Sequence, residues 1–230
     1  MSGLIWEGSP IRAVLFDFDG TLVSLEIDFD LMRNNVAEAI NRYAINESDL
    51  MENFIVERIT EARKILEQHD VENALAMERE AFTAIEDIEI EAASKAIVHE
   101  GVWELFSQLH SLGVSIGIVT RNSERSVTST LQGRPLPYDM LVSRDHTPHL
   151  KPDPRHLLAA LQAMDVPPTA AIMVGDHPTD ISAAVNLSVI GIGILNGRNN
   201  ESELMEAGAT QVVGTILELA RLLEIDTSEK

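Results

Sequence analysis

Short apolar runs alternate with longer amphipathic stretches along most of the chain. The runs end in small or polar residues and do not alternate between apolar and polar positions, which is typical of strands buried on both faces of a parallel sheet. Amphipathic segments between the runs predict helices at 102–112, 153–164 and 179–186. The predicted strands are 11–16, 114–119, 140–142, 171–174, 189–194 and, as a sixth candidate, 211–213.

The segment between the first two predicted strands has a different pattern. Glycine does not occur between Gly20 and Gly101, and apolar residues recur there at the spacing of one helical face. Such a long stretch without strand-like runs predicts a group of helices. They are expected at 28–46, from a cap at Ser48 or Asp49 to about residue 66, and at 70–94.

This helical segment interrupts the α/β pattern and predicts two domains. The fold class is therefore α/β, an open parallel sheet with a helical insertion after its first strand. We expect a core of residues 1–22 and 98–230 and a helical domain of residues 23–97. The tail, 226–230, is expected to fray.

Composition excludes several classes of function. There are 37 acidic and 17 basic residues, a net charge of −20, so nucleic acid and anionic membrane surfaces are disfavoured as partners. The chain has no cysteine, which excludes disulfides, thiolate metal sites and a cysteine nucleophile. It shows no leader pattern and no long apolar run, so we expect a cytoplasmic protein without a membrane span.

The candidate site residues follow predicted strands or precede a predicted helix. In an open parallel sheet the carboxyl ends of the strands meet at one crevice, where ligands bind. Convergence there is therefore expected for Asp17, Asp19, Thr120, Arg121, Lys151, Asp176 and Asp180.

These residue types suit an anionic, phosphorylated substrate. Carboxylates gathered at one point repel one another unless a cation lies among them, and oxygen ligands favour Mg²⁺ over Zn²⁺. Lys151 supplies a positive charge, and Thr120 supplies a hydroxyl with neighbouring backbone amides. With the metal ion, these groups are suited to bind phosphoryl oxygens.

Four motifs in this order resemble those of the haloacid dehalogenase superfamily. The first is Asp17-Phe18-Asp19-Gly20-Thr21-Leu22-Val23, the second contains Thr120, the third Lys151, and the fourth is Gly175-Asp176-His177-Pro178-Thr179-Asp180. The match extends from about residue 11 to residue 194. The helical insertion is similar to that of the subclass that includes phosphoglycolate phosphatase and β-phosphoglucomutase, with a Rossmann-like core and a cap that closes over the site.

The resemblance implies roles for the individual residues. Asp17 would be the nucleophile that forms an aspartyl phosphate, and Asp19 the general acid and base. Mg²⁺ would be held by the Asp17 carboxylate, the Asp19 carbonyl and Asp176. Lys151 and Thr120 would bind the phosphoryl group of a small phosphorylated metabolite, making the protein a phosphatase resembling phosphoglycolate phosphatase.

Several alternatives stay open. A phosphomutase of the β-phosphoglucomutase type would use the same residues, and a phosphate-binding or metabolite-binding module could keep the fold without turnover. Asp180 either holds a metal-bound water or orients Lys151, or it only caps a helix. Arg121 either binds a second anionic group of the substrate or pairs with carboxylates of the cap, and His177 is interpreted as a capping or supporting residue.

Overall fold

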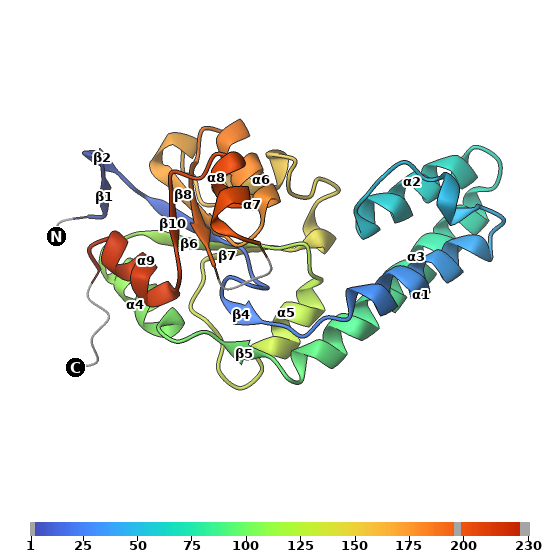
Figure 1. The fold of residues 1–230 in the computed structure, drawn as a ribbon, viewed down its shortest axis with the longest axis horizontal. Coiled ribbons are helices and arrows are strands. Elements are labelled where there is room, and N and C mark those ends of the chain that lie inside the picture. Colours follow the sequence, from blue (N-terminus) through green and yellow to red (C-terminus); the bar gives the residue numbers. More distant parts are fainter. Residues whose placement is uncertain (1–2, 196–198, 226–230) are drawn as a thin grey trace. The chain divides into compact units, whose positions relative to one another are not determined.

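The computed structural model describes residues 3–195 and 199–225, so the tail that is expected to fray lies outside the described residues. The chain forms two compact units (Figure 1). The first comprises Met1–Leu25 and Ala96–Lys230, and the second is Glu26–Lys95.

The first unit contains a six-stranded parallel sheet, which confirms the predicted α/β class. The strand order is β10-β9-β8-β3-β6-β7, with β3, the first of these strands along the chain, in the interior of the sheet. Every residue of β3 is buried, as its unbroken apolar sequence predicts. The strands are β3 Ala13–Phe16, β6 Ser115–Val119, β7 Met140–Val142, β8 Ala171–Gly175, β9 Ile190–Ile194 and β10 Gln211–Val213.

Helices cover both faces of this sheet (Figure 1). α6 and α7 pack on one face against β6 to β9, and α4 packs on the other face with α9. The predicted helices among them begin or end within two residues of the observed limits, and α5, α8 and α9 were not predicted because they are short. The helical segments are α4 Val102–Ser111, α5 Glu124–Thr130, η2 Arg144–His146, α6 Arg155–Ala163, η3 Pro168–Ala170, α7 Pro178–Asn186, α8 Glu201–Glu206 and α9 Ile216–Leu222.

Two small antiparallel sheets were not expected from the sequence. β1 Ile5–Trp6 pairs with β2 Ser9–Pro10, and β4 Val23–Ser24 pairs with β5 Ile97–Val98. Because β4 pairs with β5, the two segments that lead into and out of the second unit both belong to the first unit. The units therefore divide after Leu25 and before Ala96, a few residues from the limits expected at 22/23 and 97/98.

The second unit consists of α1 Phe29–Asn41, η1 Glu47–Asp49, α2 Ile55–Glu67 and α3 Val71–Ala93. α3 begins close to the predicted residue 70, and the Asp70 side chain caps it by accepting a hydrogen bond from the Asn73 amide at 3.0 Å. α1 ends earlier than predicted, and Ala44 nearby has a left-handed backbone with φ of 59°.

The prediction that a helix starts after Ser48 or Asp49 is wrong. Residues 50–53 are not helical, because the carboxylate of Glu61 accepts the main-chain amides of Met51 and Glu52 at 2.9 and 3.0 Å. These amides are satisfied by a side chain from α2 and not by helix formation. The helix begins at Ile55, after Phe54 in an extended conformation.

Across the described residues, none of the helices combines the length and the apolar character that a membrane span requires.

Candidate active site

Asp17, Thr120 and Asp176 directly follow the carboxyl ends of the adjacent strands β3, β6 and β8. The register of the sheet pairs Phe16 at the end of β3 with Val174 in β8. Asp17 follows directly, and its amide donates to the carbonyl of Val174 at 2.9 Å. Because β3 lies between β6 and β8, Asp17 lies between the strand ends that carry Thr120 and Asp176.

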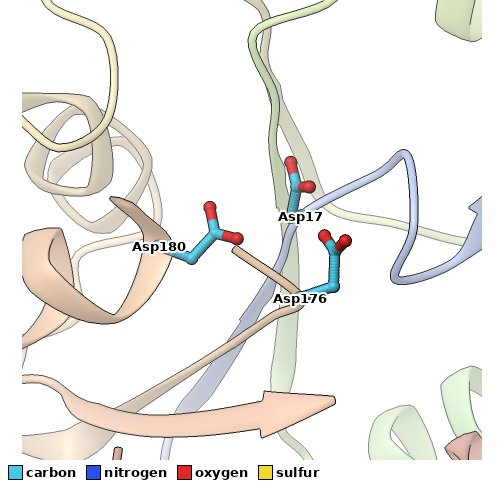
Figure 2. Close-up of side chains that lie close together, drawn as sticks. All are labelled: Asp17, Asp176 and Asp180. Atoms are coloured by element: carbon cyan, nitrogen blue, oxygen red, sulfur yellow. The ribbon is translucent and has the colours of Figure 1, made fainter. Parts of the chain in front are cut away.

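Three carboxylates meet at this point (Figure 2). One oxygen from each of Asp17, Asp176 and Asp180 lies within 4.8 Å of the others. They come from the end of β3, the residue after β8 and the first turn of α7. Carboxylates drawn from three elements in this way can hold a metal ion.

Asp180 makes the contacts expected for two of the roles considered for it, helix capping and the orientation of Lys151. Its Oδ2 accepts the His177 amide at 3.0 Å, which caps α7, and its Oδ1 lies 2.7 Å from Nζ of Lys151. His177 is a capping residue as interpreted, since its Nδ1 accepts the Thr179 amide at 3.1 Å. Helix capping and the orientation of Lys151 are therefore both performed by the Asp180 carboxylate.

Lys151 is buried, with 1% of its side chain exposed. Its Nζ donates to Oδ1 of Asp17 at 2.6 Å and to the carbonyl of Val119 at 2.7 Å, and it pairs with Asp180. An ammonium group has three hydrogens, so these partners account for all of them. The lysine is fixed between two of the three carboxylates.

The cluster holds more negative than positive charge. Burial, together with the charges of Asp17, Asp180 and Asp19, raises the pKa of Asp176 to about 8. Burial also raises the pKa of Asp17 against the opposing effect of Lys151. For Lys151, burial lowers the pKa but the two carboxylates outweigh it, so the net pKa is raised. A hard divalent cation fits this set of oxygen donors, because it supplies the missing positive charge.

Asp19 lies near the cluster but has a separate main-chain partner. Its Oδ1 accepts the amide of Leu25 at 2.9 Å, while Phe18 between the two aspartates is fully buried. Successive side chains of an extended segment point to opposite sides, so the buried Phe18 leaves Asp17 and Asp19 on the other side. The Asp19 carboxylate is tied to the chain just before it leaves the first unit.

Thr120 forms hydrogen bonds within its own loop, and Arg121 forms one with a neighbouring loop. The buried Thr120 hydroxyl donates to Oδ1 of Asn122 at 2.9 Å, and the Asn122 amide donates back to Thr120 at 3.1 Å. The guanidinium of Arg121 donates to the carbonyl of Lys151. The contact with Lys151 was not foreseen for Arg121, and Asn122 was not among the predicted site residues.

A family model for haloacid dehalogenase-like hydrolases matches residues 11–187, which is more than half of the chain. The chain belongs to this family. As a haloacid dehalogenase-like hydrolase it is an enzyme, and the resemblance seen in the four motifs is confirmed.

Curated relatives of this hydrolase include phosphatases. It is 25% identical over 232 residues to a phosphoglycolate phosphatase of Pseudomonas fluorescens, covering 95% of this chain and 83% of the relative. It is 30% identical over 181 residues to the pyrophosphatase PpaX of Bacillus cereus, covering 76% of this chain and 79% of the relative.

Solved structures agree with the fold of the hydrolase. A hydrolase from Pseudomonas syringae is 26% identical, with a TM-score of 0.64, and the match covers 94% of this chain and 98% of that one. A β-phosphoglucomutase from Clostridium difficile has the same TM-score at 19% identity, covering 93% and 97%. The second likeness concerns the fold alone.

Gly20 leaves room for the carboxylate of Asp176. It has a left-handed backbone with φ of 84°, and a Cβ at this position would lie 2.3 Å from Oδ2 of Asp176. We expect Gly20→Ala to displace this carboxylate and to lower turnover by roughly 10²-fold, measured as phosphate release with added metal. Gly133→Ala is the matched control, since Gly133 has φ of 91° with no atom within 4 Å of the added Cβ. Equal turnover in the two variants would contradict this account of Gly20.

His156 was missed by the sequence analysis. It is fully buried at the start of α6, and its Nδ1 accepts the main-chain amide of Lys151 at 3.2 Å. Burial, with added repulsion from Lys151 and Arg121, lowers its pKa to about 3. Its spacing of five residues from Lys151 was the only available signal in the sequence.

We expect His156 to make the protein less stable as the pH falls. The unfolded histidine has a pKa near 6.5 and the folded one about 3, so below pH 6.5 the unfolded state binds a proton that the folded state does not. The loss should reach about 2 kcal/mol at pH 5. Urea unfolding of the wild type and of His156→Asn between about pH 7.5 and 5 measures it. The stability advantage of the wild type should shrink with acid, and parallel curves would contradict the assignment.

Proposed function

We propose that this chain is a cytoplasmic, Mg²⁺-dependent phosphatase that hydrolyses a small phosphorylated metabolite through an aspartyl phosphate on Asp17. The observation that carries the proposal is the position of the Asp17 carboxylate, 2.6 Å from the buried ammonium of Lys151 and beside Asp176 and Asp180. Its family membership and its curated relatives, a phosphoglycolate phosphatase and a pyrophosphatase, support the same chemistry.

In the first step an oxygen of Asp17 attacks phosphorus, and the bond from phosphorus to the leaving oxygen breaks. Asp19 gives its proton to that oxygen, so the alcohol leaves neutral. In the second step water attacks the aspartyl phosphate and Asp19 takes its proton, which releases phosphate and restores both aspartates. When the phosphoryl group binds, Lys151 and Thr120 exchange hydrogen bonds made within the protein for bonds to its oxygens, and they stabilise it in both steps.

The site needs a cation for this chemistry. Asp17, the main-chain carbonyl of Asp19 and Asp176 would hold Mg²⁺, which neutralises charge on the phosphoryl group and on the carboxylates when bound. Lys151 keeps the nucleophile oriented, with its ammonium bound to Oδ1 of Asp17. Asp180 holds the lysine from the other side.

Phosphate release from a panel of esters tests the proposal. The panel comprises phosphoglycolate, pyrophosphate, hexose 1-phosphates and an aryl phosphate, each assayed with Mg²⁺ and with EDTA. We expect release that requires Mg²⁺, with a ranking that defines the substrate. Conversion of a hexose 1-phosphate to its isomer without release would instead identify a phosphomutase, and no reaction with any ester would contradict an enzymatic role on phosphate esters.

A further inference from the structure

The main chain of Lys151 is held on both sides of its α-carbon. Its N–H donates to Nδ1 of His156 at 3.2 Å, and its carbonyl accepts the guanidinium of Arg121. Its ammonium is already bound by Asp17, Asp180 and Val119. The charged group at the site is thus fixed by contacts at both ends of the residue.

His156 is built to act as a neutral acceptor. Because Nδ1 accepts a hydrogen bond, the proton of the neutral ring is on Nε2. Burial and the nearby cations of Lys151 and Arg121 keep the pKa of the ring far below neutrality, so Nδ1 stays available as an acceptor. A protonated ring would lose this acceptor and place a further positive charge beside Lys151.

The ring also has a rigid support. His156 is the second residue of α6, and the following residue, Leu157, belongs with Leu161 to the buried core under the sheet. Lys151, in contrast, lies in a turn outside any helix or strand. The contact with His156 therefore joins the loop to a packed helix.

We propose that His156 is a positioning residue for Lys151, fixing the main chain from which the ammonium reaches the phosphoryl group. This inference rests on the proposed phosphatase function. Without the acceptor, the buried amide of Lys151 loses its partner and the loop can shift to find another. A displacement of about 1 Å at a reacting centre can cost roughly 10²-fold in rate.

Three variants test the proposal. His156→Leu removes the Nδ1 acceptor and fills the buried position with an apolar side chain. His156→Asn supplies an amide oxygen near the place of Nδ1 and does not titrate. Leu157→Ala is the matched control, because it truncates a fully buried side chain in the same turn of α6 and leaves the Nδ1 acceptor of His156 in place.

Each variant is assayed for urea unfolding, for kcat and KM of phosphate release, and for inorganic phosphate binding by calorimetry. We expect His156→Leu to lower kcat and to weaken phosphate binding, each by roughly 10- to 100-fold. His156→Asn should restore both to within about threefold of the wild type. Leu157→Ala should lose at least as much unfolding free energy as His156→Leu, while its kcat stays within about threefold of the wild type.

Wild-type kcat and phosphate affinity in His156→Leu, or an equal loss in Leu157→Ala, would show that the ring only supports the fold and would overturn the proposal. Failure of the proposed function gives a different result, in which the wild type binds phosphate but releases none from any ester. The phosphate affinities of the His156 variants then decide the proposal on their own. A wild type that neither turns over esters nor binds phosphate would overturn both.

Discussion

Replacing Asp17 with asparagine is expected to lower phosphate release by at least about 10⁴-fold and to leave the fold intact. An amide lacks the nucleophilic carboxylate oxygen that the reaction requires. The fold should persist because asparagine has nearly the same shape, and Lys151 keeps Asp180 and the carbonyl of Val119 as partners. The measurement is turnover at saturating ester and Mg²⁺, together with thermal unfolding of both proteins.

Asp30→Asn is the matched control for this change. It removes one negative charge from an exposed side chain whose surface ion pair with Arg33 contributes little. This control should keep wild-type turnover. A folded Asp17→Asn protein that retained more than about one hundredth of wild-type turnover would exclude Asp17 as the nucleophile.

The second large effect is expected for Lys151→Met. Methionine fills a similar volume but leaves Asp17 and Asp180 without the cation that lies 2.6 and 2.7 Å from them. Removing one partner of a buried ion pair typically costs about 3 to 5 kcal/mol of unfolding free energy. Turnover should also fall by at least about 10²-fold, because the ammonium that stabilises negative charge on the phosphoryl group is removed. Urea unfolding and phosphate release measure the two losses separately.

Two further variants test whether the effect of Lys151→Met comes from the loss of its buried charge. Lys95→Met changes an exposed lysine, 61% of whose side chain is accessible, and should alter neither quantity. Adding Asp180→Asn to Lys151→Met should recover part of the stability, since it removes one of the unpaired carboxylates, but it should not recover turnover. A double variant no more stable than Lys151→Met would contradict the charge explanation.

The sheet and the position of the site could be predicted because both depend on local sequence. The central strands β3 and β8 are short apolar runs buried along their whole length, and they are followed by Asp17 and Asp176. Parallel strands bring their ends to one edge, so these aspartates meet however the intervening segments fold. The family motifs were recognisable for the same reason.

The features that were missed depend on contacts between particular side chains and groups in other segments of the chain. The start of α2 is set by Glu61, which binds amides nine and ten residues earlier in the chain. The double role of Asp180 requires the ammonium of Lys151, which reaches it from another loop. The sequence does not distinguish His156 from a histidine that only fills the core, because its contact with the Lys151 amide depends on the path of the loop between them. Periodicity carries no information about such pairings.

Detection of the covalent intermediate tests the central claim most directly. The wild type is mixed with its best ester and Mg²⁺, quenched with acid within one turnover, digested, and analysed by mass spectrometry. The account predicts a phosphoryl group on the peptide that contains Asp17, at a level that falls as substrate is exhausted. Rapid turnover with no phosphorylated Asp17 at any quench time, or a phosphoryl group on another residue, would contradict it.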